Sequence, residues 1–467
     1  MNQSLLRQDE EFATSAQLLI VGAGAAGLCA ALAAKDAGVE PVLVERDLVP
    51  AGSTALSAGL IPAAGTRFQR AKGILDSAQL FFADIQRKAK GQNDESVVRA
   101  ITENASYVIE WLADRYGFPF DVIDNFSYPG HSAKRMHFLP TRTGLELINR
   151  LRSSAETSDI TILTGRVADR LCVDANNRLC GLELVRNDRS RELVGCKALL
   201  LACNGFGGNP GMVRDLIPEM ARALYFGHAG NQGNAIAWGR ALGAELAHLS
   251  AYQGHGSVAT PHNILITWAV IVEGGIQINA EGRRFCDESQ GYSEQAAEIL
   301  RQPGGIAWTV FDERAASIAR QFEDFLAAER AGAILTAGTI EDLAALMRVP
   351  ISVFVGEWTN VESLKAKGKR DLHGRIFSPA QACSRPYHAV KVTGALFHTQ
   401  GGLAIDAVAR VRRENGTVFS NLFAAGGAAC GVSGTNAAGY LSGNGLLTAT
   451  VLGRLAGVAA AALISAT

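Results

Sequence analysis

A glycine cluster near the start of the chain is the feature that most constrains its fold. Residues 17–22 form an apolar run of β-strand character, an Ala- and Leu-rich helical stretch runs to Asp36, and a second β-type run, 39–44, ends in Glu45. Between the first run and the helix stand three glycines in G-x-G-x-x-G spacing: Gly22, Gly24 and Gly27. Such glycines allow a pyrophosphate to approach a helix N-terminus, while the acidic residue holds ribose hydroxyls. The segment predicts a dinucleotide-binding βαβ unit.

Charge and composition exclude several classes of function. The 467 residues include 44 basic and 45 acidic side chains. The chain therefore lacks the net positive charge with which proteins bind nucleic acid or an anionic membrane. Hydrophobic residues make up 48% and charged residues 19%, so wholesale disorder is excluded. The eight cysteines have no metal-binding, haem or iron–sulfur spacing. We expect reduced thiols, no metal site and a cytoplasmic location.

The two ends of the chain bear on membrane association. Residues 1–17 are polar and acidic, without the apolar core of a signal peptide. Residues 448–467 are mostly apolar, but Arg454 interrupts them and Ala and Gly dominate. We therefore expect a buried terminal helix and no membrane span.

The remaining patterns indicate how the chain is organised. Helical spacings predict helices within 74–117, 225–250 and 310–347, and β-type runs predict strands within 159–203, 251–290, 388–393 and 417–425. His131 and His137 are expected at the surface or in loops. Glycine-rich turns at both ends, 22–27 and 426–445, indicate one nucleotide-binding domain interrupted by a long insertion.

Several separate motifs, in order along nearly the whole chain, carry a family resemblance. They are residues 21–27 with Glu45, 52–59, 201–206, 282–288, 398–402, and 422–426 with 443–447. On these motifs the chain resembles the FAD-dependent flavoproteins related to fumarate reductase, succinate dehydrogenase and 3-ketosteroid Δ1-dehydrogenase. The resemblance implies an α/β fold: a discontinuous Rossmann-like FAD-binding domain (1–248 and 397–467) with an inserted α+β capping domain (249–396).

The resemblance also implies a set of FAD-binding residues. They are Gly22, Gly24, Ala25, Ala26, Gly27, Glu45, Arg46, Ser53, Thr54, Ser57, Ala58, Gly59, Val167, Ala202, Asn204, Gly205, His398, Gly426, Asn444, Gly445, Leu446 and Leu447. Covalent members carry a histidine where this chain has Ser53, which implies noncovalent FAD. Many relatives carry a ribityl-binding glutamate where Gly427 stands. The helix after Gly443 would direct its positive end at the flavin and favour hydride acceptance.

Three positions distinguish the chemistry of the family's branches. Fumarate reductases carry cationic groups where this chain has Tyr292, Phe397 and Tyr440, and the acid and arginine of their proton path fall on Trp268 and Ile271. From that substrate shell His255 remains. A dicarboxylate would lose its hydration in this mostly neutral, aromatic pocket without gaining charged partners, which disfavours fumarate reduction.

Tyrosines at two of these positions resemble the ketosteroid dehydrogenase branch. There one tyrosine, here Tyr292, removes the proton α to a carbonyl, and a second, here Tyr440, binds the carbonyl oxygen together with a backbone N–H, here Gly443. The spacing between Tyr440 and Gly443 differs by one residue from that of the steroid enzymes. Tyr128 resembles a Tyr-Pro loop that supports the base, and His255 could hydrogen-bond a substrate oxygen or Tyr292.

The sequence therefore predicts an FAD-dependent enzyme that desaturates a cyclic ketone, of the cyclohexanone or 3-ketosteroid type, at its α,β bond. Donors that hold enolate charge make the α C–H acidic, and the hydride from the β carbon passes to flavin N5. The alternatives are a fumarate-type enoate or dicarboxylate reductase and a flavin subunit that docks an electron-transfer partner. The electron acceptor is left open among oxygen, a quinone and a redox protein.

Overall fold

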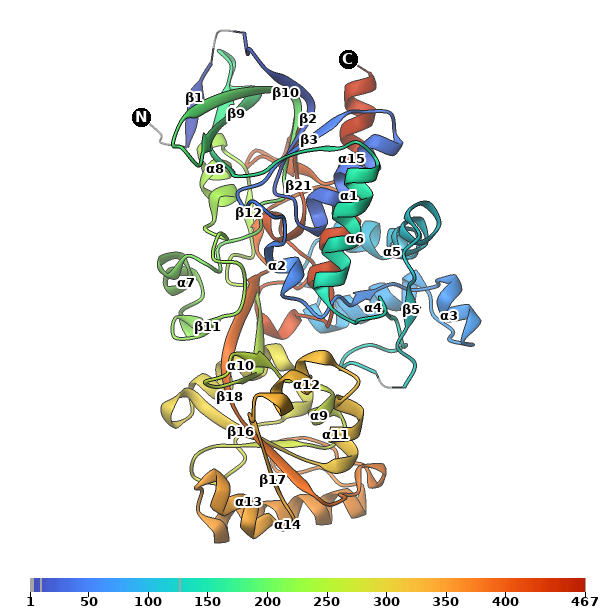
Figure 1. Ribbon diagram of the computed structural model, residues 1–467, viewed down its shortest axis with the longest axis vertical. Helices are drawn as coiled ribbons and strands as arrows, with labels where there is room; N and C mark the ends of the chain where they lie inside the picture. The colour runs from blue at the N-terminus through green and yellow to red at the C-terminus, as the bar shows by residue number, and fades with distance from the viewer. Residues whose placement is uncertain (1–3, 9–10, 126, 467) are drawn as a thin grey trace. The chain divides into compact units, whose positions relative to one another are not determined.

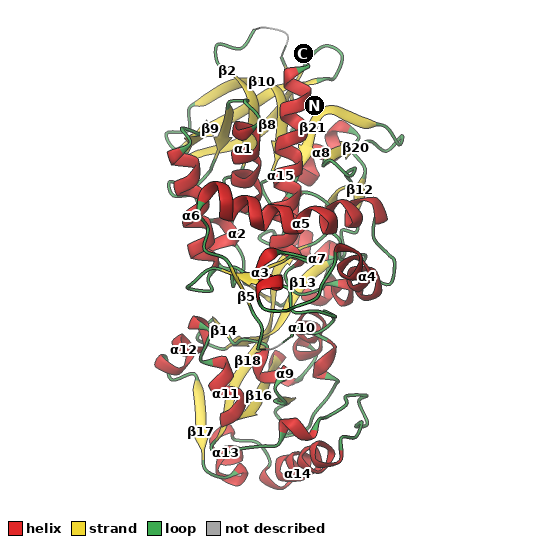
Figure 2. Cartoon of the chain, turned by 90° about the vertical axis from the view of Figure 1, so that its right-hand side faces the viewer, coloured by secondary structure: helices red, strands yellow, loops and turns green. Residues whose placement is uncertain are grey.

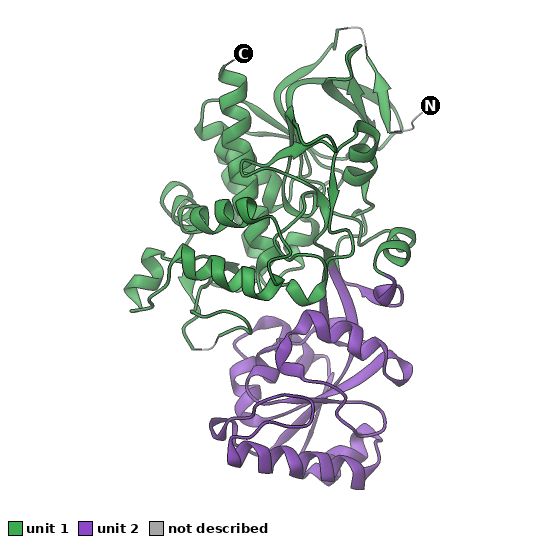
Figure 3. Ribbon diagram, turned by 180° about the vertical axis from the view of Figure 1, so that it is seen from behind, with its two compact units in different colours: residues 1–217, 227–252, 398–467 green, residues 218–226, 253–397 purple. Residues whose placement is uncertain are grey.

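The computed structural model describes residues 4–8, 11–125 and 127–466. These residues form two compact units (Figure 3). Unit 1 comprises residues 1–217, 227–252 and 398–467, and unit 2 comprises residues 218–226 and 253–397.

Unit 1 is built on a sheet with a parallel centre (Figure 1). The central strands lie in the order β7 (Thr161–Leu163), β3 (Pro41–Val44), β2 (Ser15–Val21), β10 (Arg191–Leu201) and β21 (Val418–Ala424), and every neighbouring pair is parallel. Leu18, Leu19 and Ile20 of β2 are fully buried. Helices cover both faces of a parallel sheet, which explains why this strand reads as a continuous apolar run.

Antiparallel strands extend this sheet. β9 (Leu179–Arg186) pairs with β10 and with β8 (Arg166–Val173), β1 (Leu5–Arg7) joins β8 in parallel, and β20 (Arg410–Arg412) pairs with β21. Two smaller sheets complete unit 1: β4 (Ile61–Pro62), β6 (Met136–Phe138) and β5 (Asp121–Val122), and β12 (Leu246–Ala247) with β19 (Gly402–Leu403).

Two helices from opposite ends of the chain pack tightly together in unit 1. α1 (Ala25–Asp36) is buried over most of its surface, and α15 (Asn444–Ser465) lies against it. A Cβ at Gly453 would overlap the carbonyl oxygen of Ala26, and one at Gly457 would overlap that of Ala30. The two glycines therefore allow the backbones to approach closely.

The remaining helices of unit 1 are shown in red in Figure 2. They are α2 (Gly52–Ala55), α3 (Arg67–Ala71), α4 (Ala78–Ala89), α5 (Glu95–Tyr116), α6 (Gly144–Thr157), α7 (Pro210–Leu216) and α8 (Asn234–Leu242). By length and composition alone α15 could also cross a membrane, but it packs on α1 and α5, as a core helix does.

Unit 2 contains a mostly antiparallel sheet with helices around it. Its strands follow the order β14 (Ile264–Leu265), β13 (Tyr252–Ala259), β18 (Tyr387–Thr399), β16 (Ile306–Asp312) and β15 (Ile276–Ile278), and β11 (Leu224–Tyr225) and β17 (Ile334–Ala337) also pair with β18. The helices are α9 (Ala269–Val272), α10 (Tyr292–Leu300), α11 (Glu313–Ala319), α12 (Glu323–Arg330), α13 (Ile340–Met347) and α14 (Ile351–Lys367).

Most elements predicted from the sequence are confirmed, with the following differences. Within 225–250 only residues 234–242 form an α-helix, since β11 and β12 occupy parts of the range. The helical block at 310–347 contains β17, and several helices, α6, α10 and α14 among them, were not predicted. His137 is not at the surface: it is fully buried in β6, where Nε2 hydrogen-bonds Thr66 Oγ1 at 2.8 Å. The predicted domain limits at 248 and 396 stay a prediction.

The packing of α15 on α1 yields a matched pair of helix substitutions. Gly453→Ala places a methyl group against the Ala26 carbonyl, so the free energy of unfolding should fall by about 1–3 kcal/mol. Gly356→Ala, in the exposed interior of α14, meets no atom within 4 Å and should stabilise by roughly 1 kcal/mol through helix propensity. Urea unfolding of the two variants checks both signs. A Gly453→Ala variant as stable as the parent would contradict this account of the interface.

Candidate functional site

The predicted nucleotide-binding turn has the tight geometry that its glycines indicate. Gly22 has a φ of 103°, and a Cβ there would lie 2.6 Å from the carbonyl oxygen of Ala202. A Cβ at Gly27 would overlap the Gly22 carbonyl. Gly24 is the N-cap of α1 and supplies no side-chain cap, and a helix N-terminus of this kind can offer backbone donors to a ligand.

Glu45 and Thr54 brace this turn from neighbouring segments. Glu45 Oε2 accepts a hydrogen bond from Ala23 N at 2.8 Å, and its Oε1 accepts from Asp47 N at 3.0 Å. Thr54 Oγ1 accepts from Ala25 N at 3.1 Å. The carboxylate therefore stands beside the glycine turn, where the sequence predicted it, and it also holds the turn's backbone.

Ser53 lies in a network of amide donors. Its hydroxyl oxygen accepts from Asn231 Nδ2 at 2.9 Å, from Asn204 Nδ2 at 3.2 Å and from His228 N at 3.2 Å. His228 Nε2 in turn lies 2.8 Å from Asp47 Oδ2. Asn231 and His228 were missed by the sequence analysis, because no motif in 225–250 marks them.

The second glycine-rich turn, which contains Gly426 and Gly427, lies close to the first. A Cβ at Gly426 would lie 3.1 Å from the Ala26 side chain, which places this turn beside α1. A side chain at Gly427 would overlap Asn204 Oδ1, and one at Gly205 would overlap Thr399 Oγ1. The space that a side chain at position 427 would need is therefore occupied by Asn204.

The N-terminus of α15 carries the predicted oxyanion residues of unit 1. Tyr440 is buried, and its phenol oxygen accepts from Gly445 N at 3.4 Å. The His398 ring lies 5.9 Å from that of Tyr440, edge to face, and a Cβ at Gly445 would lie 2.6 Å from His398 Nε2. Burial lowers the pKa of His398 to about 4, so this imidazole is neutral at pH 7.

The loop that contains Tyr128 lies next to the same turn. His131 Nε2 hydrogen-bonds Ser442 O at 3.0 Å, and a Cβ at Gly130 would lie 2.7 Å from Leu441 Cδ1. Tyr128 itself is half-buried, two residues before Gly130. Unit 1 thus brings the predicted Tyr128 loop to the Tyr440–Gly443 turn, whose Gly443 is the N-cap of α15.

The two glycine-rich turns, 22–27 and 426–445, form what we call the glycine cradle. The other predicted cofactor residues lie around it. Arg46 borders Gly230, where a Cβ would crowd the guanidinium, and Arg166 N, beside Val167, donates to Glu45 O at 3.0 Å. Ser57 Oγ donates to Thr54 O at 2.7 Å and accepts from Gly59 N, which places Ala58 in this turn. Leu446 and Leu447 lie in the first turn of α15.

The cradle in unit 1 fits the FAD that the resemblance implies. Gly22 and Gly27 allow the tight turn that this cofactor family uses before a helix, and Gly24 at the N-cap of α1 carries no side chain that would block a ligand. Asn444 is fully buried at the start of α15, and its Oδ1 has no hydrogen-bond partner among the described residues. A buried acceptor without a partner costs free energy unless a ligand or water satisfies it.

Unit 2 gathers the other two predicted catalytic residues into an aromatic cluster. The His255 ring stacks on Tyr292 with centroids 4.6 Å apart and on Phe397 at 5.2 Å, and Trp268 meets it edge-on at 5.7 Å. Phe226, which no motif indicated, stacks on Phe397 at 4.9 Å. His255 is 5% exposed, and burial lowers its pKa to about 3, so its imidazole is uncharged at pH 7.

Two buried arginines of unit 2, Arg284 and Arg375, are already paired. Arg284 contacts both Glu288 and Asp371, at 2.8 Å and 2.5 Å, and Arg375 contacts Glu288 at 3.0 Å. Burial alone would raise the pKa of Glu288, but Arg375 and Arg284 lower it to about 2. These cations therefore neutralise internal carboxylates. Arg375 was not predicted, because its partners are far away in sequence.

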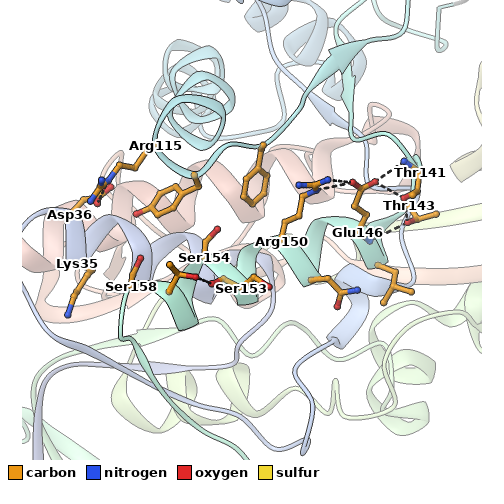
Figure 4. Close-up of a pocket in the computed structure, with 15 residues that line it drawn as sticks. Lys35, Asp36, Arg115, Thr141, Thr143, Glu146, Arg150, Ser153, Ser154 and Ser158 are labelled. Atoms are coloured by element: carbon orange, nitrogen blue, oxygen red, sulfur yellow. Dashed lines mark hydrogen bonds and ion pairs between the residues drawn. The ribbon is translucent and has the colours of Figure 1, made fainter.

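A pocket of about 1050 Å³ lies elsewhere in unit 1, along α6 (Figure 4). Four of its charged side chains form two pairs: Arg150 Nε donates to Glu146 Oε1 at 2.8 Å, and Arg115 Nε donates to Asp36 Oδ1 at 3.2 Å. None of the predicted site residues lines it. The candidate functional residues are therefore those of the glycine cradle in unit 1 and, separately, those of the aromatic cluster in unit 2.

Comparisons with known proteins agree with the features of unit 1. A family model described as an FAD binding domain matches residues 17–446. The probable fumarate reductase Ifc3 of Shewanella frigidimarina (strain NCIMB 400) is 30% identical over 444 residues, which are 94% of this chain and 74% of that protein. The resemblance stated from the motifs is thereby confirmed.

Solved structures agree on the fold. The open conformation of a flavocytochrome c3 fumarate reductase superposes with a TM-score of 0.81 at 28% identity, covering 97% of this chain and 79% of that one. The 3-ketosteroid-Δ4-(5α)-dehydrogenase of Rhodococcus jostii RHA1 superposes with a TM-score of 0.77 at 24% identity, covering 97% and 98%. The chain belongs to the FAD binding domain family and is an FAD-dependent oxidoreductase, among relatives that act on C=C or CH–CH groups.

Proposed function

We propose that the enzyme desaturates a cyclic ketone at its α,β bond. The observation that carries the proposal is the neutral aromatic cluster of unit 2, in which Tyr292 stacks on an uncharged His255. The buried Arg284 and Arg375 are committed to Glu288 and Asp371 and do not supply a carboxylate clamp. A ketone, unlike a dicarboxylate, needs no cationic partners to leave water.

We assign removal of the α proton to Tyr292. It is the first residue of α10, where the positive end of the helix dipole favours a phenolate. Its ring is 8% exposed and packs on His255 and Trp268, which keep water from a carbanion that forms beside it. Tyrosine has an ordinary pKa of about 10, so this support from the helix is needed for it to act as a base.

We assign the carbonyl oxygen to Tyr440. Gly445 N donates to its phenol oxygen at 3.4 Å, and a phenol can donate its own proton to a carbonyl oxygen. Negative charge that develops on the carbonyl oxygen is then stabilised by a donor fixed at the N-terminus of α15. When bound, FAD supplies the acceptor for the hydride from the β carbon.

A fumarate-type reductase is the second candidate, because the similar proteins include reductases. Ifc3 and the flavocytochrome c3 enzyme are both named as fumarate reductases, at 30% and 28% identity. Against this stand Tyr292, Phe397 and Tyr440 at the positions where the resemblance places cationic groups. Neither proposal specifies the electron acceptor, which the sequence leaves open among oxygen, a quinone and a redox protein.

The amide network around Ser53 leads us to propose noncovalent FAD. A serine hydroxyl that accepts hydrogen bonds from Asn204 and Asn231 offers no imidazole for a bond to the flavin. Acid precipitation followed by centrifugation should leave the yellow colour in the supernatant. Colour that stays with the precipitated protein would contradict this.

Tyr440→Phe tests the oxyanion role. The change removes one donor to the developing charge and should lower turnover by roughly 10²–10³-fold with FAD still bound. Tyr116→Phe, a tyrosine of unit 1 outside the candidate site, is the control and should keep parental turnover. Parental turnover in Tyr440→Phe would move the donor role to another residue.

Tyr292→Phe tests the base. It keeps the ring that stacks on His255 but removes the hydroxyl, so flavin reduction by ketone should fall by roughly 10²–10⁴-fold. Solvent deuterium exchange at the ketone's α carbon should fall with it. Tyr387→Phe is the matched control, since Tyr387 is equally buried, at 8% exposed, in the core of unit 2. Undiminished exchange in Tyr292→Phe would exclude this residue as the base.

A further inference from the structure

A buried lysine in unit 2 contacts a cysteine thiol. Lys365 stands near the C-terminus of α14 and is 3% exposed. Its Nζ lies 3.2 Å from Sγ of Cys383, in the segment that follows residues 379–381. Among the described residues Lys365 forms no ion pair. A lysine buried without a carboxylate is unusual, because its charge costs desolvation energy.

The surroundings favour the neutral forms of this pair. Burial lowers the pKa of the Lys365 ammonium, which Cys383 and Asp312 partly oppose, and Arg375 lowers it further. Burial raises the pKa of the Cys383 thiol, and Lys365 opposes that rise. Asp312 is occupied elsewhere, since Oδ2 accepts from Ser384 N at 2.8 Å and Oδ1 from Ala315 N at 3.0 Å. A larger share of this amine is therefore neutral, and so nucleophilic, than in an ordinary lysine, and its Nζ lies beside the sulfur.

The sulfur of this pair lies close to solvent, whereas the amine does not. Cys383 is half-buried, and its neighbours Ala382, Ser384 and Arg385 are exposed. We therefore expect a small oxidant to enter at this partly exposed segment, whereas Lys365 itself is buried. Because the raised pKa of Cys383 keeps its thiolate fraction low, we expect oxidation to be slower than at an exposed thiol.

We propose that Lys365 and Cys383 are a redox modification site, at which hydrogen peroxide joins the two side chains by a sulfur–nitrogen bond. In the first step the sulfur attacks peroxide: an S–O bond forms, the O–O bond breaks, and water leaves with the thiol proton. In the second step the amine attacks the sulfenic sulfur: an S–N bond forms, the S–O bond breaks, and a second water leaves with an amine proton. Sulfur loses two electrons, and peroxide gains them.

The bond would restrain a segment that packs on α9. Gln381 Nε2, two residues before Cys383, donates to Val272 O at 2.8 Å. α9 follows Trp268, whose ring contacts Tyr292 and His255. Cross-linking would fix the end of α14 to this segment, so the thermal unfolding midpoint of unit 2 should rise on oxidation.

The test uses the FAD-loaded enzyme treated with hydrogen peroxide, digested without reductant and analysed by peptide mass. The expected product is a linked pair of peptides that joins Lys365 to Cys383, with two hydrogens lost and no oxygen gained, and dithiothreitol should separate it. Cys286 is the internal control: its Sγ lies 2.8 Å from the amide Nε2 of Gln295, which is not a nucleophile, so no link should form there.

Two variants keep the result interpretable. Lys365→Arg keeps a long basic side chain but lacks a nucleophilic amine, and Cys383→Ser removes the sulfur, so both should give unlinked peptides and no rise in the unfolding midpoint. If Cys383 of the parent enzyme is oxidised to its sulfinic acid with the peptides separate, or stays a thiol while Cys286 is oxidised, the proposal is overturned. Peptide mapping of the peroxide-treated parent enzyme tests the proposal even if a variant fails to fold.

Discussion

The close contact between α1 and α15 is the constraint on which the flavin-binding unit depends. These helices come from opposite ends of the chain, and they meet through Gly453 and Gly457, which lie against the carbonyls of Ala26 and Ala30. That approach places Gly426 beside Ala26 and fixes the N-terminus of α15 in the same unit as that of α1. Two helix N-termini in one unit offer positive dipole ends to an anionic cofactor.

The second determinant is the distribution of charge in unit 2. A buried cation can form an ion pair with a substrate or with an internal carboxylate, and here Arg284 and Arg375 are paired with Glu288 and Asp371. The cluster of His255, Tyr292 and Trp268 is left neutral, with the imidazole pKa lowered to about 3. This neutrality is the physical reason for our preference for a ketone over a dicarboxylate, although similar proteins are named as fumarate reductases.

The sequence was informative where a local steric or chemical demand leaves a mark in a short segment. Gly22 and Gly27 could be assigned from spacing, because a Cβ at either position would overlap backbone, and Glu45 follows from the same βαβ unit. Phe226, Asn231 and Arg375 could not be found, since each acts through partners distant in the chain. His137 was misplaced because nothing in its own segment indicates Thr66 as its partner. The roles of Tyr292 and Tyr440 stay predictions.

Anaerobic reduction of the bound flavin tests the central claim most directly. The oxidised enzyme is mixed, without oxygen, with cyclohexanone-type ketones, a 3-ketosteroid and succinate in turn, and the visible absorbance of the flavin is followed. The neutral cluster around Tyr292 predicts bleaching by at least one cyclic ketone and none by succinate. Bleaching by succinate, or rapid reoxidation of the dye-reduced enzyme by fumarate with every ketone inert, would contradict the account.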